Sequence, residues 1–231
     1  MRRASALFSA FLMAVVLTVA AVRGDEASNV LRRDSGDVTV GFAGASPARL
    51  IGTISVPGAA NATTGAKSLA TLQLADSSEI RIGDRTSVNI GNLRKAADDP
   101  RVAVVTLNRG AIRFTVLHPE GARANYRFVT PTTQIAVRGT SGYLISGPAG
   151  DQVYCISCEG DVAVAGPFGV VSLHTGQTLN VGVRNGAVVS SEVVANPTVN
   201  NPAIDQFLGG KSPFGVPASL GSDPTGSGSG A

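Results

Sequence analysis

Hydrophobic and polar residues alternate with a period of two over most of the chain, from about Val38 to Val194. Gly, Asp, Asn and Pro interrupt this alternation every several residues, and no stretch within it keeps the 3.6-residue period of a helix over ten or more positions. Short alternating runs between turns are typical of β-strands. The pattern therefore predicts an all-β domain over residues 38–194, with a dozen or so short antiparallel strands in a two-layer sandwich or a short β-solenoid.

Two turns within this region carry specific predictions. The sequence Asn108-Arg109-Gly110 separates two apolar alternations and predicts a hairpin turn there. Asn185-Gly186 is a stronger hairpin signal, because a two-residue turn of the favoured type needs positive φ at both positions and Asn-Gly adopts it easily. We expect both sites to connect neighbouring antiparallel strands.

The segments on either side of the β domain lack its alternating pattern. Residues 25–37 are expected to form a flexible lead-in. Residues 195–231 form a tail rich in Pro, Gly and Asn, and its low-complexity end is expected to be disordered. One short helix is predicted within the tail, beginning at Pro202 with Asn201 as its N-cap and ending before Gly209 as its C-cap.

The N-terminus predicts export. Arg2 and Arg3 precede a run of 16 uncharged residues, Leu7 to Val22, and small residues follow. Such a run is shorter than the roughly 20 residues that span a bilayer, and its flanks are those of a secretory signal peptide. We assign residues 1–24 to the signal peptide and expect a periplasmic or secreted protein. Attachment to a membrane would then require that the leader stay uncleaved.

Charge argues against a nucleic-acid partner. The signal peptide holds three arginines and no acid, so 16 basic and 16 acidic residues remain in the rest of the chain. A nucleic-acid-binding protein needs a concentrated basic face, and the basic pairs here are isolated. We therefore expect no nucleic-acid partner.

A series of motifs in fixed order resembles the FecR-like domain family. It begins at Thr64-Gly65 and continues through "SLATLQLADSSEIRIGDRTSV" (68–88) and "VVTLNRGAIRF" (104–114). It continues with "FVTPTTQIAVRGTSGYLI" (128–145), which carries the family's Thr-Pro and Arg-Gly-Thr signature, and then with "VYCISCEGDVAV" and "VSLHTGQTL". The resemblance covers roughly residues 64–180.

This resemblance implies an extracytoplasmic, β-rich, non-catalytic module that binds, senses or scaffolds. The best-known members are iron-uptake regulators with a cytoplasmic anti-sigma segment, a transmembrane helix and a periplasmic sensor domain. No anti-sigma segment precedes the hydrophobic run in this sequence, so we expect a stand-alone exported domain. Its partner would be an envelope protein or a glycan, bound at sheet edges or Gly-rich loops, and no cofactor is expected.

The Arg138-Gly139-Thr140 signature is interpreted as a structural joint between two strands. A glycine inside a strand pattern marks a bulge or a close backbone approach. Arg138 would pair across strands or cap loop carbonyls, and Thr140 would satisfy a backbone group at the bend. A catalytic interpretation needs the hydrolase elbow Gly-x-Ser-x-Gly around Ser141, but the second glycine comes one residue early. We therefore expect no catalytic residue.

The two cysteines of the chain, Cys155 and Cys158, leave alternatives open. Export favours a disulfide, yet residues three apart in a regular strand are about 10 Å apart, and a bridge tolerates at most about 7 Å between Cα atoms. A disulfide therefore requires a turn or bulge at Ile156-Ser157; buried thiols are the other structural possibility. The alternative function is a small metal- or thiol-dependent envelope protein centred on this pair with His174, and with His118 as a further ligand.

Overall fold

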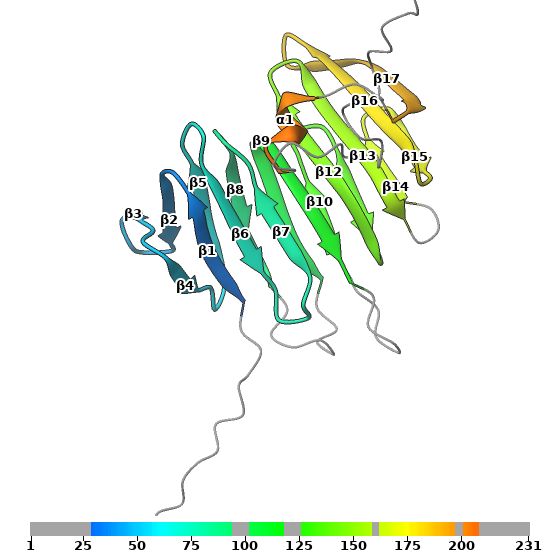
Figure 1. Ribbon diagram of the computed structural model, residues 1–231. Helices are drawn as coiled ribbons and strands as arrows, with labels where there is room; N and C mark the ends of the chain where they lie inside the picture. Colours follow the sequence, from blue (N-terminus) through cyan, green and yellow to red (C-terminus); the bar gives the residue numbers. More distant parts are fainter. Residues whose placement is uncertain (1–28, 94–101, 118–125, 159–161, 197–200, 208–231) are drawn as a thin grey trace, which may run out of the picture.

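The computed structural model describes residues 29–93, 102–117, 126–158, 162–196 and 201–207 (Figure 1). The expected signal peptide, most of the low-complexity tail, Gly209 and His118 lie outside these residues. Most of the described residues belong to strands, and the one helix is a single turn, which confirms the all-β prediction.

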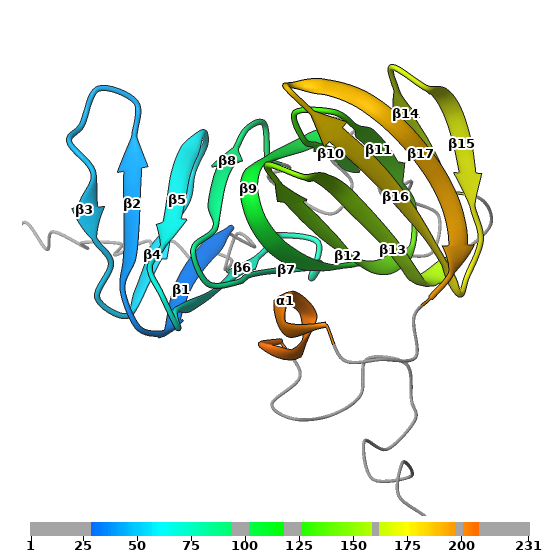
Figure 2. The same ribbon diagram turned by 90° about the horizontal axis from the view of Figure 1, so that it is seen from above.

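The strands form two sheets that are stacked face to face (Figure 2). Both alternatives from the sequence are partly right, because the fold has two layers and its strands are also added in nearly sequential order from one end to the other. In one sheet, here sheet A, the order is β4 (Thr53–Ser55), β1 (Val30–Ser35), β6 (Leu69–Gln73), β7 (Glu79–Ile82), β9 (Ala103–Val116), β12 (Thr140–Gly147), β13 (Gly150–Cys158), β16 (Gln177–Arg184), β17 (Ala187–Ala195). In sheet B it is β3 (Ala48–Arg49), β2 (Val38–Phe42), β5 (Ala60–Thr64), β8 (Ser87–Ile90), the first half of β9, β10 (Tyr126–Val129), β11 (Gln134–Val137), β14 (Val162–Gly166), β15 (Gly169–Leu173).

The long strand β9 belongs to both sheets. Its first half pairs with β8 and β10 in sheet B, and its second half, from Gly110 on, pairs with β7 and β12 in sheet A. The hairpin predicted at Asn108-Arg109-Gly110 is therefore wrong: the chain crosses between layers there without reversing. The β9–β10 pair is parallel, and the other ladders are antiparallel.

The hairpin predicted at Asn185-Gly186 is confirmed. Both residues have positive φ, 52° and 76°, and they connect β16 to β17 directly.

The prediction of a flexible lead-in is wrong for Val30–Ser35, because these residues form β1 between β4 and β6. Leu31 is fully buried there and packs in the main core.

The core between the sheets consists mainly of Val, Ile, Leu and Ala from the inward positions of each strand. The alternation is visible in the burial of single strands, for example β5 and β11, whose residues alternate between buried and exposed. Among the few rings of this core, Phe114 and Phe128 are stacked with 4.6 Å between their centroids.

A single helical turn, α1 (Pro202–Asp205), lies outside the stack on the side of sheet A (Figure 2). Asn201 is its N-cap, as predicted, and its side chain accepts a hydrogen bond from the amide of Ala203 at 3.0 Å. The helix ends at Asp205, and its C-cap is Gln206 rather than the expected Gly209.

Candidate functional site at the disulfide and the adjoining sheet edge

The Arg138-Gly139-Thr140 signature connects the two layers. β11 ends at Val137 in sheet B, and β12 begins at Thr140 in sheet A. Gly139 is buried and has a φ of +55°, a conformation that glycine adopts without a steric penalty. The Thr140 hydroxyl donates to the carbonyl of Arg138 at 3.0 Å, across the bend.

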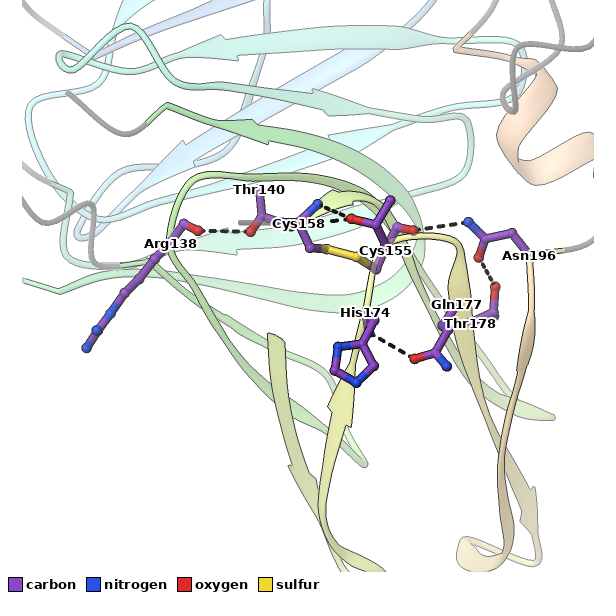
Figure 3. Close-up of a disulfide and its surroundings, with 9 residues drawn as sticks. Arg138, Thr140, Cys155, Cys158, His174, Gln177, Thr178 and Asn196 are labelled. Carbon is purple, nitrogen blue, oxygen red and sulfur yellow. Dashed lines mark hydrogen bonds between the residues drawn. A yellow bond between two sulfur atoms is a disulfide. The ribbon is translucent and has the colours of Figure 1, made fainter. Parts of the chain in front are cut away.

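Arg138 points away from this bend into solvent (Figure 3). Its guanidinium makes no hydrogen bond or ion pair with another described residue. The expected cross-strand pairing or capping by Arg138 is therefore not seen within the described part of the chain, and the bend depends on the backbone of Gly139 and the hydroxyl of Thr140.

Cys155 and Cys158 are joined by a disulfide in β13 (Figure 3). Their Cα atoms are 6.0 Å apart because β13 is not regular between them. The register with β12 shifts at this point: Gly142 lies opposite Cys155, and Ser141 lies opposite Ser157. Ile156 is thus the extra residue of a β-bulge, which shortens the span between the two cysteines.

The backbone around the disulfide is tied to the beginning of β16 and the end of β17. The carbonyl of Cys155 accepts from the amide of Gly176 and from the side chain of Asn196, both at 3.0 Å. The hydroxyl of Thr175 accepts from the amide of Cys158 at 2.9 Å. The bulge therefore positions the His174–Gln177 turn and the last residues of the edge strand.

The chemistry available at this point is limited by the bond between the sulfurs. A disulfide sulfur is neither a thiolate nucleophile nor a thiolate metal ligand. His174 lies on the adjacent turn, where its amide donates to the side chain of Gln177 at 2.9 Å. Among the residues whose positions are described, no group of three or more His, Cys, Asp and Glu side chains is placed to hold a metal ion.

One buried carboxylate escaped the sequence analysis. Asp151 is 2% exposed and accepts hydrogen bonds from the hydroxyls of Thr130 and Thr132. These threonines flank Pro131 in the Thr-Pro signature, so the motif serves to satisfy a carboxylate from β13. In the sequence Asp151 follows a Gly-Pro-Ala-Gly turn, where an acid is ordinarily solvated, so no local signal distinguishes it.

The strand β17 forms a free edge of sheet A. Within the described ranges it pairs with β16 and with no other strand. Its residues are exposed or half-exposed throughout, including Val189 at 59% and Val193 at 39%, and Glu192 is its one charged residue. On sheet B the neighbouring edge strand β15 exposes Val170 at 71%. An edge strand that has one side without a partner, apolar side chains and a single charge is a ready template for pairing with another strand.

None of the described helices has the length and hydrophobicity of a membrane span. No curated protein sequence matches the chain. Two crystal structures of a candidate anti-sigma factor from Parabacteroides distasonis ATCC 8503, at 2.50 and 1.65 Å resolution, are similar to it at 16% and 17% identity, with TM-scores of 0.48 and 0.47. The similarity covers 60% and 59% of this chain, and the chain spans only those same shares of the two proteins.

A family model described as FecR protein matches residues 60–163. The matched segment runs from β5 into β14 and includes the Arg138 bend and the disulfide. It also includes most of the motifs on which the resemblance was based, so the resemblance is confirmed. Over residues 60–163, this chain is therefore similar to the FecR family.

Proposed function

We propose that this chain is a non-catalytic binding module, acting in the periplasm or outside the cell, that recognises an envelope protein through the free edge of β17. The observation that carries the proposal is the exposure of this nine-residue strand along its whole length. A partner segment in extended conformation would add to sheet A through main-chain hydrogen bonds, and its alternate side chains would meet Val189 and Val193.

The surrounding structure supports this function. The turn at His174–Gln177 and the end of β17 are held by hydrogen bonds to the disulfide-bonded segment, so the edge is presented on a rigid support. Pre-organisation of a binding strand lowers the entropy cost of association. A sensing role, as in the regulators of the FecR family, would use this contact to detect the state of the partner.

The test uses cells that produce the full chain with a tag after Ala231. The captured material is compared, after chemical cross-linking, with that from a Val189→Lys variant, because a lysine on an edge strand blocks strand addition. The matched control is Ile51→Lys, which places the same charge on an aliphatic side chain that is 84% exposed and lies between β3 and β4.

We expect the native chain to capture one envelope protein at stoichiometric yield. The captured amount should fall at least about tenfold with Val189→Lys and should be retained with Ile51→Lys. Capture that is equal for both variants would place the contact elsewhere and overturn the edge assignment. Recovery of polysaccharide alone, or of nothing, would overturn the protein partner. Osmotic-shock fractionation of the same cells tests export, and retention of the chain in the cytoplasm would contradict it.

A further inference from the structure

The outer face of sheet A carries an apolar patch where a solvent-facing sheet surface would be polar. We define the outer patch as Ala111, Tyr143 and Tyr154 with the partly buried residues Leu69, Ile145 and Ile156. Tyr143 and Tyr154 lie directly opposite each other on β12 and β13, with ring centroids 6.4 Å apart and the rings nearly perpendicular. This cluster is separate from the core between the sheets.

The segment 201–207 covers the outer patch. Ile204 is completely buried and Phe207 is 3% exposed, and the Phe207 ring lies 5.9 Å from the ring of Tyr143. These two side chains are three positions apart, so one helical turn places both on the same face. The segment therefore inserts an Ile-x-x-Phe pair against two tyrosines.

Polar contacts fix the register of the segment. Asn201 donates to the Tyr154 hydroxyl at 3.0 Å, Arg81 donates to the carbonyl of Phe207 at 2.8 Å, and the side-chain oxygen of Gln206 accepts from the amide of Asp84 at 2.5 Å. Gly83 is part of this fit, since a Cβ there would lie 2.6 Å from the Gln206 oxygen. The outer patch and the residues beside it therefore contact both apolar and hydrogen-bonding groups of the segment.

Three features indicate that this contact is that of a docked ligand. A single helical turn is unstable by itself in water, so α1 depends on the patch for its structure. The segment also forms no strand pair with either sheet. Moreover, the residues that receive it lie within the family-matched segment 60–163, and the segment itself lies beyond it.

We infer that the outer patch is a peptide-docking site, occupied in cis by residues 201–207, which takes a segment of the same chemistry from a partner protein. That segment is an Asn-capped helical turn with two apolar side chains at i and i+3 and an amide side chain between them. The cis segment competes for the site, so the patch opens only when α1 detaches. The inference does not depend on the β17 edge, which lies on a different strand.

To test the inference, the double substitution Ile204→Ser and Phe207→Ser is made in the full chain. It removes the two apolar side chains that hold the segment on the outer patch, so the patch becomes open. The probe is a fluorescent synthetic peptide with the sequence of residues 199–209, and its anisotropy reports binding. The opened chain is expected to bind the peptide at least about tenfold more tightly than the native chain, because a site filled in cis is available only in the detached fraction. A peptide with both serines is expected not to bind, and Gly83→Ala in the opened chain is expected to weaken binding.

An opened chain that unfolds cooperatively like the native chain but fails to bind the peptide would overturn the inference. A second measurement uses the native chain and needs no variant. Hydrogen exchange at the amides of Ile204 and Phe207 is expected to be at least about a hundredfold faster than in β12 and β13, since local detachment requires less free energy than global unfolding. Equal protection would show that the segment is an integral part of the core and would also overturn the inference.

Discussion

The hydroxyl of Thr86 accepts a hydrogen bond from the amide of Ala111 at 3.0 Å, at the point where β9 leaves one sheet for the other. The same hydroxyl donates to the carbonyl of Asp84 at 3.0 Å. Gly110 lies against this side chain with a φ of +100°. The crossing of β9 therefore depends on two features. The buried hydroxyl of Thr86 forms a hydrogen bond with the β9 backbone, and the missing Cβ of Gly110 lets the two segments approach closely.

The first prediction is that Gly110→Ala destabilises the fold by about 2–4 kcal/mol. A Cβ at this position would lie 2.6 Å from the Cα of Thr86, which is backbone and cannot rotate away. The positive φ adds strain for any residue with a side chain. Equilibrium urea unfolding, followed by far-ultraviolet circular dichroism, measures the change.

The matched control is Gly147→Ala at the end of β12. A Cβ on Gly147 meets no atom within 4 Å, and its φ is not in the left-handed region. Its expected effect is within about 0.5 kcal/mol. Equal losses from the two substitutions would show that the close approach at Thr86 is not what constrains β9.

The error at Gly110 shows what alternation can and cannot reveal. A glycine with positive φ between two alternating runs is common to a hairpin and to a strand that bends between layers. The two structures differ only in which strands lie beside each half, and these partners, β8 and β10 for one half and β7 and β12 for the other, are remote in sequence. Asn185-Gly186 was predictable because its turn geometry is entirely local.

The features at the two ends of the domain that differ from the sequence prediction, or that go beyond it, have a similar cause. β1 contains two arginines, an aspartate and a serine, and Leu31 is its one fully buried side chain. Its sequence reads as polar because a strand near an edge needs few apolar residues. For α1 the Asn201 cap could be predicted from the sequence, but the burial of Ile204 and Phe207 could not, since it depends on Tyr143 and Tyr154, which are remote in the sequence. The disulfide likewise depended on a bulge that only the register with β12 reveals.

A second prediction concerns the turn between β6 and β7, where Ser77 has a φ of +67°. The turn consists of Asp76-Ser77-Ser78, and a non-glycine residue with this φ is strained. Replacing Ser77 with glycine removes the left-handed strain, and we expect a stabilisation of about 0.5–1 kcal/mol. Thermal and urea unfolding measure it.

Ser78→Gly provides the contrast within the same turn. The Ser78 hydroxyl accepts from the amide of Leu117 at 3.1 Å, so its removal is expected to destabilise the fold by about 1 kcal/mol. If both glycine variants shifted stability in the same direction, backbone strain at Ser77 would not be the cause.

A third prediction separates the stabilising role of the disulfide from binding. Replacing both Cys155 and Cys158 with alanine is expected to cost about 2 kcal/mol, as the chain-entropy model gives for so short a loop. Partner capture through β17 should persist under conditions where the variant stays folded. Loss of capture by a variant with a native circular dichroism spectrum would show that the sulfurs take part in recognition.

The last prediction follows from burial of the outer patch. Desolvation raises the pKa of both Tyr143 and Tyr154 above the ordinary value of 10.0. Below that value both tyrosines are neutral in the folded and the unfolded chain, and their contribution to stability is constant. As the pH rises above it, the unfolded chain loses these protons first, so the free energy of unfolding falls until the folded pKa values are passed.

The expected result is a decline of the urea midpoint as the pH rises above the ordinary tyrosine pKa of 10.0, and this decline should be steeper for the native chain than for Tyr143→Phe/Tyr154→Phe. The double variant keeps both rings but loses the hydroxyl contact between Tyr154 and Asn201, so its midpoint should be lower than the native midpoint at neutral pH, and this difference should shrink as the native tyrosines begin to titrate. Other titrating groups are common to both proteins and cancel in the comparison. Parallel pH profiles would mean that the two hydroxyls are solvated in the folded chain, and that the segment 201–207 does not shield the outer patch from water.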